Sequence, residues 1–145
     1  MKILILHGPN LNMLGKRDEK HYGSQTLDEI SNRLTVIAKE NNMEVAFFQS
    51  NHEGALIDYL QENAGSASGI LINPGALTHY GYSLRDALSD TKLPIVEVHL
   101  SDIENRDDFR KIDVLTGIVI EKIMGMKEKS YTLGLEKLIK YIQKL

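Results

Sequence analysis

The sequence predicts an α/β protein whose doubly wound parallel sheet carries helices on both faces. Four short apolar runs, at residues 3–6, 45–48, 70–72 and 95–98, have the composition of strands that are buried on both faces. Helical patterns separate these runs, and strands that alternate with helices form parallel sheets through right-handed crossovers. Because 145 residues with 42% apolar composition suffice for one core, we expect residues 1–145 to form a single domain.

Each predicted helix has a local signal. Thr26 and Glu29 form a capping box, which opens a helix that we expect to end near Asn41. Apolar residues at helical spacing predict a second helix over Glu53–Asn63. The remaining expected elements are a third helix over 82–89, a charged loop over 102–111, a fifth strand within 118–124, and a last helix over about 129–144.

The composition excludes several classes of function. The 17 basic and 20 acidic residues give a net charge of −3 without a basic cluster, so we expect no nucleic-acid or membrane-binding surface. The absence of cysteine excludes disulfides, thiolate metal sites and thiol nucleophiles. The first apolar run is too short for a signal peptide, and no segment has the roughly 20 apolar residues of a membrane span. We therefore expect a cytoplasmic protein.

Polar clusters follow all four clear strands. Ligands of such sheets bind outside the carboxyl ends of the strands, so these clusters mark the expected site. The loop from Gly8 to Thr26 is also much longer than the roughly 2 to 6 residues that a strand-to-helix connection needs. The polar clusters occupy residues 7–10, 49–53, 73–79 and 97–101.

The candidate site has residues for proton transfer. No dinucleotide fingerprint, phosphate loop or metal-ligand spacing is present, so we expect no cofactor and no metal. A tyrosine base would need a nearby cation, because a phenol ordinarily keeps its proton at neutral pH. Arg17 could serve Tyr22 if the loop closes over the site, with Gly15 and Gly23 as hinges. The candidate residues are Asn10, Arg17, Tyr22, Asn73, His79, His99, Ser101 and Arg110.

Several separate motifs together resemble one enzyme family. They are GPNLNMLGKRDEKHYG, FQSNHEG, INPGALTHYGYSLRDAL, PIVEVHLSDIENRDDFR and YTLGLEKL, and they cover nearly the whole chain. Their sequence and order resemble type II 3-dehydroquinate dehydratase, a lyase of the shikimate pathway of aromatic amino acid biosynthesis. The resemblance implies a flavodoxin-like fold, no cofactor or metal, and a dodecamer built from trimers. It also implies anti elimination of water from 3-dehydroquinate through an enolate intermediate, which gives 3-dehydroshikimate.

The resemblance also implies a role for individual residues. Tyr22 matches the base, and Arg17 matches the lid arginine that activates it. Asn10 matches a residue that holds a water against the enolate oxygen, and His99, oriented by Glu97, matches the acid that protonates the leaving hydroxyl. The residues that match substrate-binding positions are Asn73, His79 and Arg110 for the hydroxyls, Ser101 and the Leu100 backbone for the carboxylate, and Asp86 for a neighbouring subunit's site.

The chain departs from the family pattern at a few positions. Asp18 and Glu19 follow the lid arginine where Glu-Pro is common, and the loss of proline is expected to loosen the lid. Asp113 replaces a common serine, and Lys127 and Ser130 replace common glycines. We expect these three changes to affect the fifth strand or subunit packing rather than the chemistry.

A second class of function stays open on the sequence alone. The chain could be a flavodoxin-like binding module for a nucleotide or flavin, although the missing phosphate loop argues against it. His79 and His99 could also be structural histidines, and Arg110 could be a solvated charge. Stabilisation by flavin rather than by dehydroquinate analogues would favour the binding module.

Overall fold

Five parallel strands form the central sheet, in the spatial order β2-β1-β3-β4-β5. The computed structural model describes all residues from 1 to 145. The strands are β1 (Lys2–His7), β2 (Glu44–Gln49), β3 (Gly69–Asn73), β4 (Ile95–Val98) and β5 (Glu121–Ile123). The predicted fold class is confirmed, and the strand order is the flavodoxin-like one.

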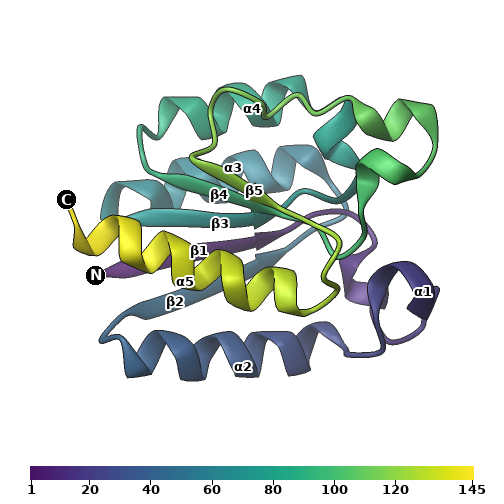
Figure 1. The fold of residues 1–145 in the computed structure, drawn as a ribbon. Helices are drawn as coiled ribbons and strands as arrows, with labels where there is room; N and C mark the ends of the chain where they lie inside the picture. The colour runs from purple at the N-terminus through teal and green to yellow at the C-terminus, as the bar shows by residue number, and fades with distance from the viewer.

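Two helices cover each face of the sheet, as Figure 1 shows. α2 (Leu27–Glu40) and α5 (Lys129–Gln143) lie on one face, and α3 (Glu53–Asn63) and α4 (Tyr82–Asp90) lie on the other. The predicted capping box forms at the start of α2, where the Glu29 amide donates to Thr26 Oγ1 at 3.2 Å. The short helix α1 (Glu19–Tyr22) interrupts the long first loop and was not predicted.

Successive side chains of β1 point to opposite faces of the sheet, and this explains why both faces need helices. Ile3 and Ile5 belong to the core under α2 and α5, whereas Leu4 and Leu6 belong to the core under α3 and α4. All four side chains are fully buried. Since successive residues of a strand point to opposite faces, a continuous apolar run produces two cores.

The carboxyl ends of β1 and β3 meet at the point where the chain order reverses. The Gly8 amide donates to the Asn73 carbonyl at 2.8 Å, which ties the two strand ends together. A Cβ atom on Gly8 would lie 2.2 Å from the Pro74 carbonyl oxygen, so only glycine permits this approach. The loops that diverge from this point carry the polar clusters predicted from the sequence.

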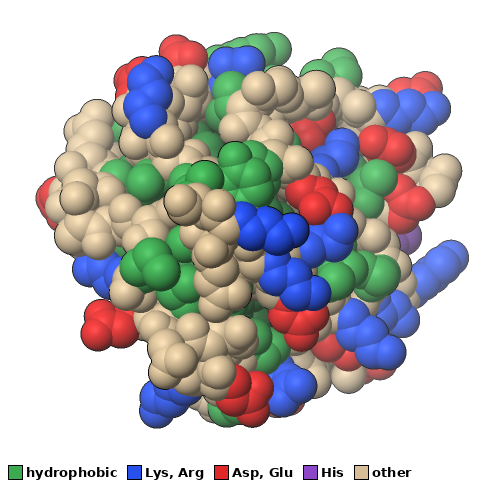
Figure 2. All heavy atoms as spheres, turned by 60° about the vertical axis from the view of Figure 1, so that its left-hand side comes forward, with side chains coloured by type: hydrophobic (Ala, Val, Ile, Leu, Met, Phe, Trp, Pro, Cys, Tyr) green, Lys and Arg blue, Asp and Glu red, His purple; other side chains and the backbone are tan.

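The surface has no extended region of a single charge on the face shown in Figure 2. Lys and Arg side chains lie among Asp and Glu side chains there, with small apolar groups between them. None of the helices combines the length and the apolarity that a membrane crossing requires.

Gly8→Ala is expected to destabilise the protein by about 2 kcal/mol or more, because the added methyl group meets backbone atoms that cannot move aside. The matched control is Gly54→Ala in α3, where the new Cβ has no neighbour within 4 Å. That change should be neutral or stabilising, since alanine favours helices. Urea unfolding of both variants measures the difference, and equal stabilities would contradict the close approach.

Candidate active site

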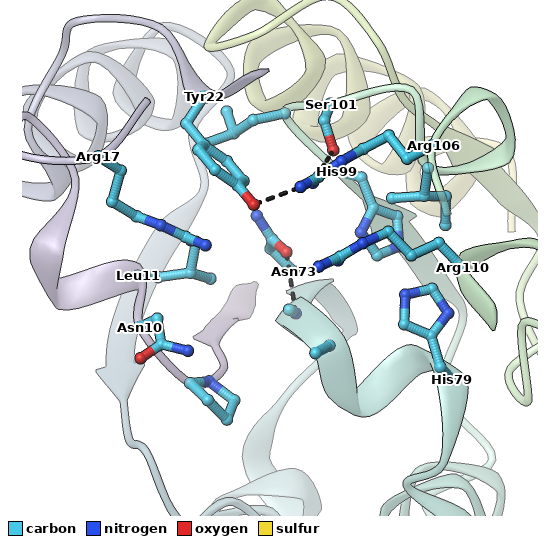
Figure 3. A pocket seen from close by; sticks show the side chains of 15 residues that line it. Asn10, Leu11, Arg17, Tyr22, Asn73, His79, His99, Ser101, Arg106 and Arg110 are labelled. Atoms are coloured by element: carbon cyan, nitrogen blue, oxygen red, sulfur yellow. Dashed lines mark hydrogen bonds between the residues drawn. The ribbon is translucent and has the colours of Figure 1, made fainter. Parts of the chain in front are cut away.

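A pocket lies beyond the carboxyl ends of β1, β3 and β4, and α1 closes one side of it (Figure 3). Nine of the eleven residues that the sequence singled out line this pocket: Asn10, Arg17, Tyr22, Asn73, His79, His99, Leu100, Ser101 and Arg110. Of the other two, Glu97 lies directly behind His99, and Asp86 is exposed on α4. The structure therefore brings together residues from four separate segments of the chain.

Two arginines hold Tyr22 in the pocket. The guanidinium carbon of Arg17 lies 3.7 Å from the centre of the Tyr22 ring. Arg106 Nη1 donates a hydrogen bond to the Tyr22 hydroxyl at 2.9 Å, from the other side of the pocket (Figure 3). The Tyr22 ring and the Tyr22 hydroxyl therefore each face a positively charged group.

Arg106 is the site residue that sequence reasoning missed. It lies in the charged loop over 102–111, from which the sequence analysis singled out only Arg110 as a candidate. Besides Tyr22 it contacts Ser101, whose hydroxyl accepts from Arg106 Nη1 at 3.2 Å. The available signal was its spacing: Arg106 and Arg110 are four residues apart in a loop that follows the polar end of β4.

The first loop contains a capped helix, α1. The Asp18 side chain accepts from the Lys20 amide at 2.9 Å, at the N-terminus of α1. Gly23 ends α1 with φ at 76°, a left-handed value that favours glycine. Asp18 supplies one local hydrogen bond at the start of α1. The looser lid expected from the absent proline stays a prediction.

His99 is held by a buried carboxyl group. His99 Nε2 lies within hydrogen-bond distance of Glu97 Oε1, at 2.6 Å, and both side chains are almost completely buried. Burial raises the pKa of Glu97, the His99 hydrogen bond lowers it, and the nearby Asp113 raises it, so the pKa lies above its ordinary value. The contact fixes the ring and leaves Nδ1 as the nitrogen available for proton transfer.

His79 is held in one tautomer. Its Nδ1 lies 2.6 Å from the Ile112 carbonyl oxygen, which can only accept, so Nδ1 carries the hydrogen. Burial lowers the pKa of His79, and although the Ile112 carbonyl raises it, the net pKa lies below the ordinary value. The ring is therefore neutral near pH 7, and Nε2 can accept a hydrogen bond from a ligand hydroxyl.

Three guanidinium groups and no carboxylate line the pocket. Burial lowers the pKa of Arg17, the Tyr22 side chain raises it, and the neighbouring Arg106 and Arg110 lower it. An arginine still keeps its charge at neutral pH, so the pocket is strongly cationic. Such a pocket selects a small anionic ligand, and a carboxylate matches the planar guanidinium donors.

The residues closest to a metal-binding arrangement are Glu97, His99 and Asp113. Their potential ligand atoms lie within 4.8 Å of one another. The Thr78 hydroxyl contacts both carboxyl groups, and the Lys122 ammonium lies 3.3 Å from Asp113 Oδ2. A cation already pairs with this cluster, so the arrangement fits a hydrogen-bond network better than a metal site.

The fold and the pocket together define a class of protein. The pocket is cationic and lies where the strand order of a doubly wound sheet reverses. It contains a tyrosine and a histidine that is hydrogen-bonded to a carboxyl group. These features are typical of an α/β enzyme that moves protons on a small anionic substrate.

Comparison with known proteins gives the family. Residues 1–139 match the family described as dehydroquinase class II, and the chain belongs to this family. It is 52% identical over 139 residues to the 3-dehydroquinate dehydratase of Roseiflexus castenholzii, covering 96% of this chain and 88% of that protein. The crystal structure of type II dehydroquinase from Butyrivibrio crossotus superimposes with a TM-score of 0.91 at 42% identity, covering 95% of this chain and 97% of that one. The type II dehydroquinase from Propionibacterium acnes gives 0.90 at 34% identity, with 96% of each chain covered.

His7 is a buried residue that is linked to the pocket wall through Tyr131. It is buried at the end of β1, and its Nδ1 lies 2.8 Å from the hydroxyl of Tyr131 in α5. Burial lowers the pKa of His7 to about 4. Burial also raises the pKa of Tyr131, which the hydrogen bond with Asn73 opposes. His7 and Tyr131 thereby connect α5 to Asn73 in the pocket wall.

The lowered pKa of His7 predicts a pH dependence of stability. The unfolded state takes up this proton near pH 6.5 and the folded state only near pH 4, so the free energy of unfolding falls by about 3 kcal/mol as pH drops across that range. His7→Asn removes this contribution and should flatten the decline, whereas the exposed control His52→Asn should not. Urea unfolding at pH values from 7 to 4 measures the free energy of unfolding of each protein. Parallel curves of this free energy against pH for the wild type and both variants would contradict the role given to His7.

Proposed function

We propose that this protein is a 3-dehydroquinate dehydratase, which removes water from 3-dehydroquinate to give 3-dehydroshikimate in the shikimate pathway. Its membership of the class II dehydroquinase family supports this substrate. The observation that carries the proposal is the position of Tyr22, between Arg17 and Arg106 and in the same pocket as His99. A base and an acid that face one pocket are what an elimination requires.

The first step of the proposed reaction forms an enolate. The Tyr22 phenolate takes a proton from the carbon beside the ketone, and the electron pair of that bond moves onto the ketone oxygen. In the proposal, Asn10 holds a water molecule against this oxygen. Hydrogen bonds aimed at a developing negative charge stabilise the transition state by a few kcal/mol. Arg17 and Arg106 favour the phenolate before the transfer.

The second step expels the hydroxyl group. As the enolate collapses, a double bond forms in conjugation with the ketone, and the departing hydroxyl takes a proton from His99 and leaves as water. Glu97 holds the His99 ring during this transfer. Tyr22 ends protonated and His99 ends neutral, so solvent must return one proton to His99 and remove one from Tyr22. The two groups act on opposite sides of the substrate, which makes the elimination anti.

The remaining polar groups would hold the substrate. Ser101 and the backbone of Leu100 form the proposed carboxylate site, and the Leu100 peptide is oriented by a hydrogen bond from the Lys127 amide at 2.9 Å. Arg106, which donates to Ser101, adds a charge beside this site. The proposed partners of the substrate hydroxyls are Asn73, His79 and Arg110.

We further propose that the protein assembles as a dodecamer built from trimers, with Asp86 completing a neighbouring subunit's site. Asp86 is exposed on α4 and lies outside the pocket of its own chain. Apolar side chains that a subunit contact would cover lie at the start of α4 and between β4 and β5, each more than half exposed: Tyr80, Tyr82, Phe109 and Ile112. Exposed apolar groups of this kind favour self-association.

Tyr22→Phe should reduce turnover by at least about 100-fold, since it removes the group that accepts the proton. The test adds purified protein to 3-dehydroquinate without metal or cofactor and follows the ultraviolet absorbance of the conjugated enone. Tyr141→Phe, on the exposed side of α5, is the matched control and should keep normal activity. Wild-type turnover in Tyr22→Phe, or none in the folded wild-type protein, would overturn the proposal.

The role of Asp86 can be tested by mixing two variants with reduced activity. We expect Asp86→Asn to lower turnover, because a neighbouring site loses a charged contact. Co-assembly of Asp86→Asn with Tyr22→Phe should restore activity, since some sites would combine an intact Tyr22 with an intact Asp86 from another chain. No recovery in the mixed assembly, or full activity of a stable monomer, would show that Asp86 does not serve a neighbouring site.

A further inference from the structure

A buried network behind His99 has no role in the steps above. It joins Glu97, Thr78 and Asp113 to Lys122 of β5. The Thr78 hydroxyl lies 2.5 Å from Glu97 Oε1 and 2.9 Å from Asp113 Oδ1. The Asp113 carboxyl is 4% exposed and lies beside Glu97, which holds the proposed acid His99. From the sequence, Asp113 was expected to affect the fifth strand or subunit packing rather than the chemistry.

A count of hydrogens shows that the network holds an additional proton. Thr78 has one hydroxyl hydrogen, yet its oxygen contacts carboxyl oxygens of both Glu97 and Asp113. If Glu97 and Asp113 were both ionised, the Thr78 hydroxyl could donate its hydrogen to only one of them. Its oxygen lone pair would then face the negatively charged oxygen of the other. Glu97 Oε2 is also buried without a hydrogen-bond partner, and the only cation beside Asp113 Oδ2 is the Lys122 ammonium at 3.3 Å. One proton shared by the two carboxyl groups supplies the missing donor, as in other paired carboxylates.

The surroundings of the two groups decide where this proton resides. Asp113 receives the Leu115 amide at 2.8 Å and lies 3.3 Å from the Lys122 ammonium, which both favour its ionised form. Burial raises the pKa of Asp113, but hydrogen bonds from Glu97, Leu115 and Thr78 and the charge of Lys122 hold it below its ordinary value. Glu97 is fully buried and has no lysine or arginine partner. The proton therefore resides on Glu97.

We propose that Asp113 is a positioning residue for the acid step: together with Lys122 it keeps one proton on Glu97, so that His99 faces a neutral carboxyl group. A neutral carboxyl still accepts the hydrogen bond from His99 Nε2, and so it fixes the ring. It attracts an imidazolium less strongly than a carboxylate does, and His99 therefore gives up its proton more readily. This inference rests on the proposed function of His99 as the acid.

The other charged groups near the pair do not change this assignment. Glu104, in the 3₁₀ turn Ile103–Asn105, also forms an ion pair with Lys122, at 3.2 Å. On the pocket side, His79 is held neutral, and the Arg110 guanidinium pairs with Asp107 at 3.3 Å. Lys122 is thus the cation in direct contact with the carboxyl pair, and its contact is with Asp113 rather than Glu97.

Infrared spectroscopy tests the shared proton directly. The wild-type protein at pH 7 should show the carbonyl stretch of a protonated carboxylic acid, and Glu97→Gln should remove it. In Asp113→Asn the band should be lost at a lower pH than in the wild-type protein, because the neighbouring negative charge is gone while burial still favours the protonated form of Glu97. The control Asp108→Asn changes the same charge at a fully exposed side chain and should leave the band in place. The absence of the band from the wild-type protein would overturn the proposal without any variant.

The effect on His99 is measured by its titration in NMR spectra, with His99→Gln used to assign the signal. In Asp113→Asn an ionised Glu97 would stabilise the imidazolium, so the midpoint of His99 should rise by about one pH unit, a tenfold change. The pH at which turnover declines on the alkaline side should rise with it. An unchanged midpoint, equal to that of Asp108→Asn, would show a merely structural role. The spectra need no turnover, so an inactive protein that shows both effects would contradict only the proposed function.

Discussion

The close approach of the β1 and β3 ends is the constraint on which the site depends. It requires glycine at position 8, because any Cβ would collide with the Pro74 carbonyl. From this point one loop leads through Asn10 to the lid, and the other leads through Asn73 to His79. The two loops diverge over adjacent strands, which leaves a pocket between them. The rigid sheet thus sets the positions of groups that lie far apart in the sequence.

Charge separates the pocket into two regions with different tasks. Arg17, Arg106 and Arg110 line the accessible side, where they favour an anionic ligand. The carboxyl groups of Glu97 and Asp113 lie behind His99, out of solvent. His99 lies between these two regions. An arrangement that held the carboxylates in the pocket would instead cancel the positive charge that binds the substrate.

The sequence predicts the features that depend on local patterns. Continuous apolar runs located four strands, and the capping box located the start of α2. The strand-end rule selected Asn73 and His99, which the structure brings into one pocket. Arg106 was not predicted because its loop has no periodic pattern. The helix α1 was not predicted because four residues are too few to show a helical pattern. Asp113 reaches the Glu97 network because of the way an irregular loop packs, and no local sequence pattern predicts that packing.

The proposed elimination depends most on Tyr22 and His99 acting from opposite sides of one substrate. The most direct measurement uses 3-dehydroquinate with deuterium at the carbon beside the ketone, placed on the side opposite to the leaving hydroxyl. Mass spectrometry of the product should find this label lost, and it should find the label retained when the other hydrogen is replaced. Retention of the first label, or loss of the second, would contradict the arrangement of base and acid proposed for this pocket.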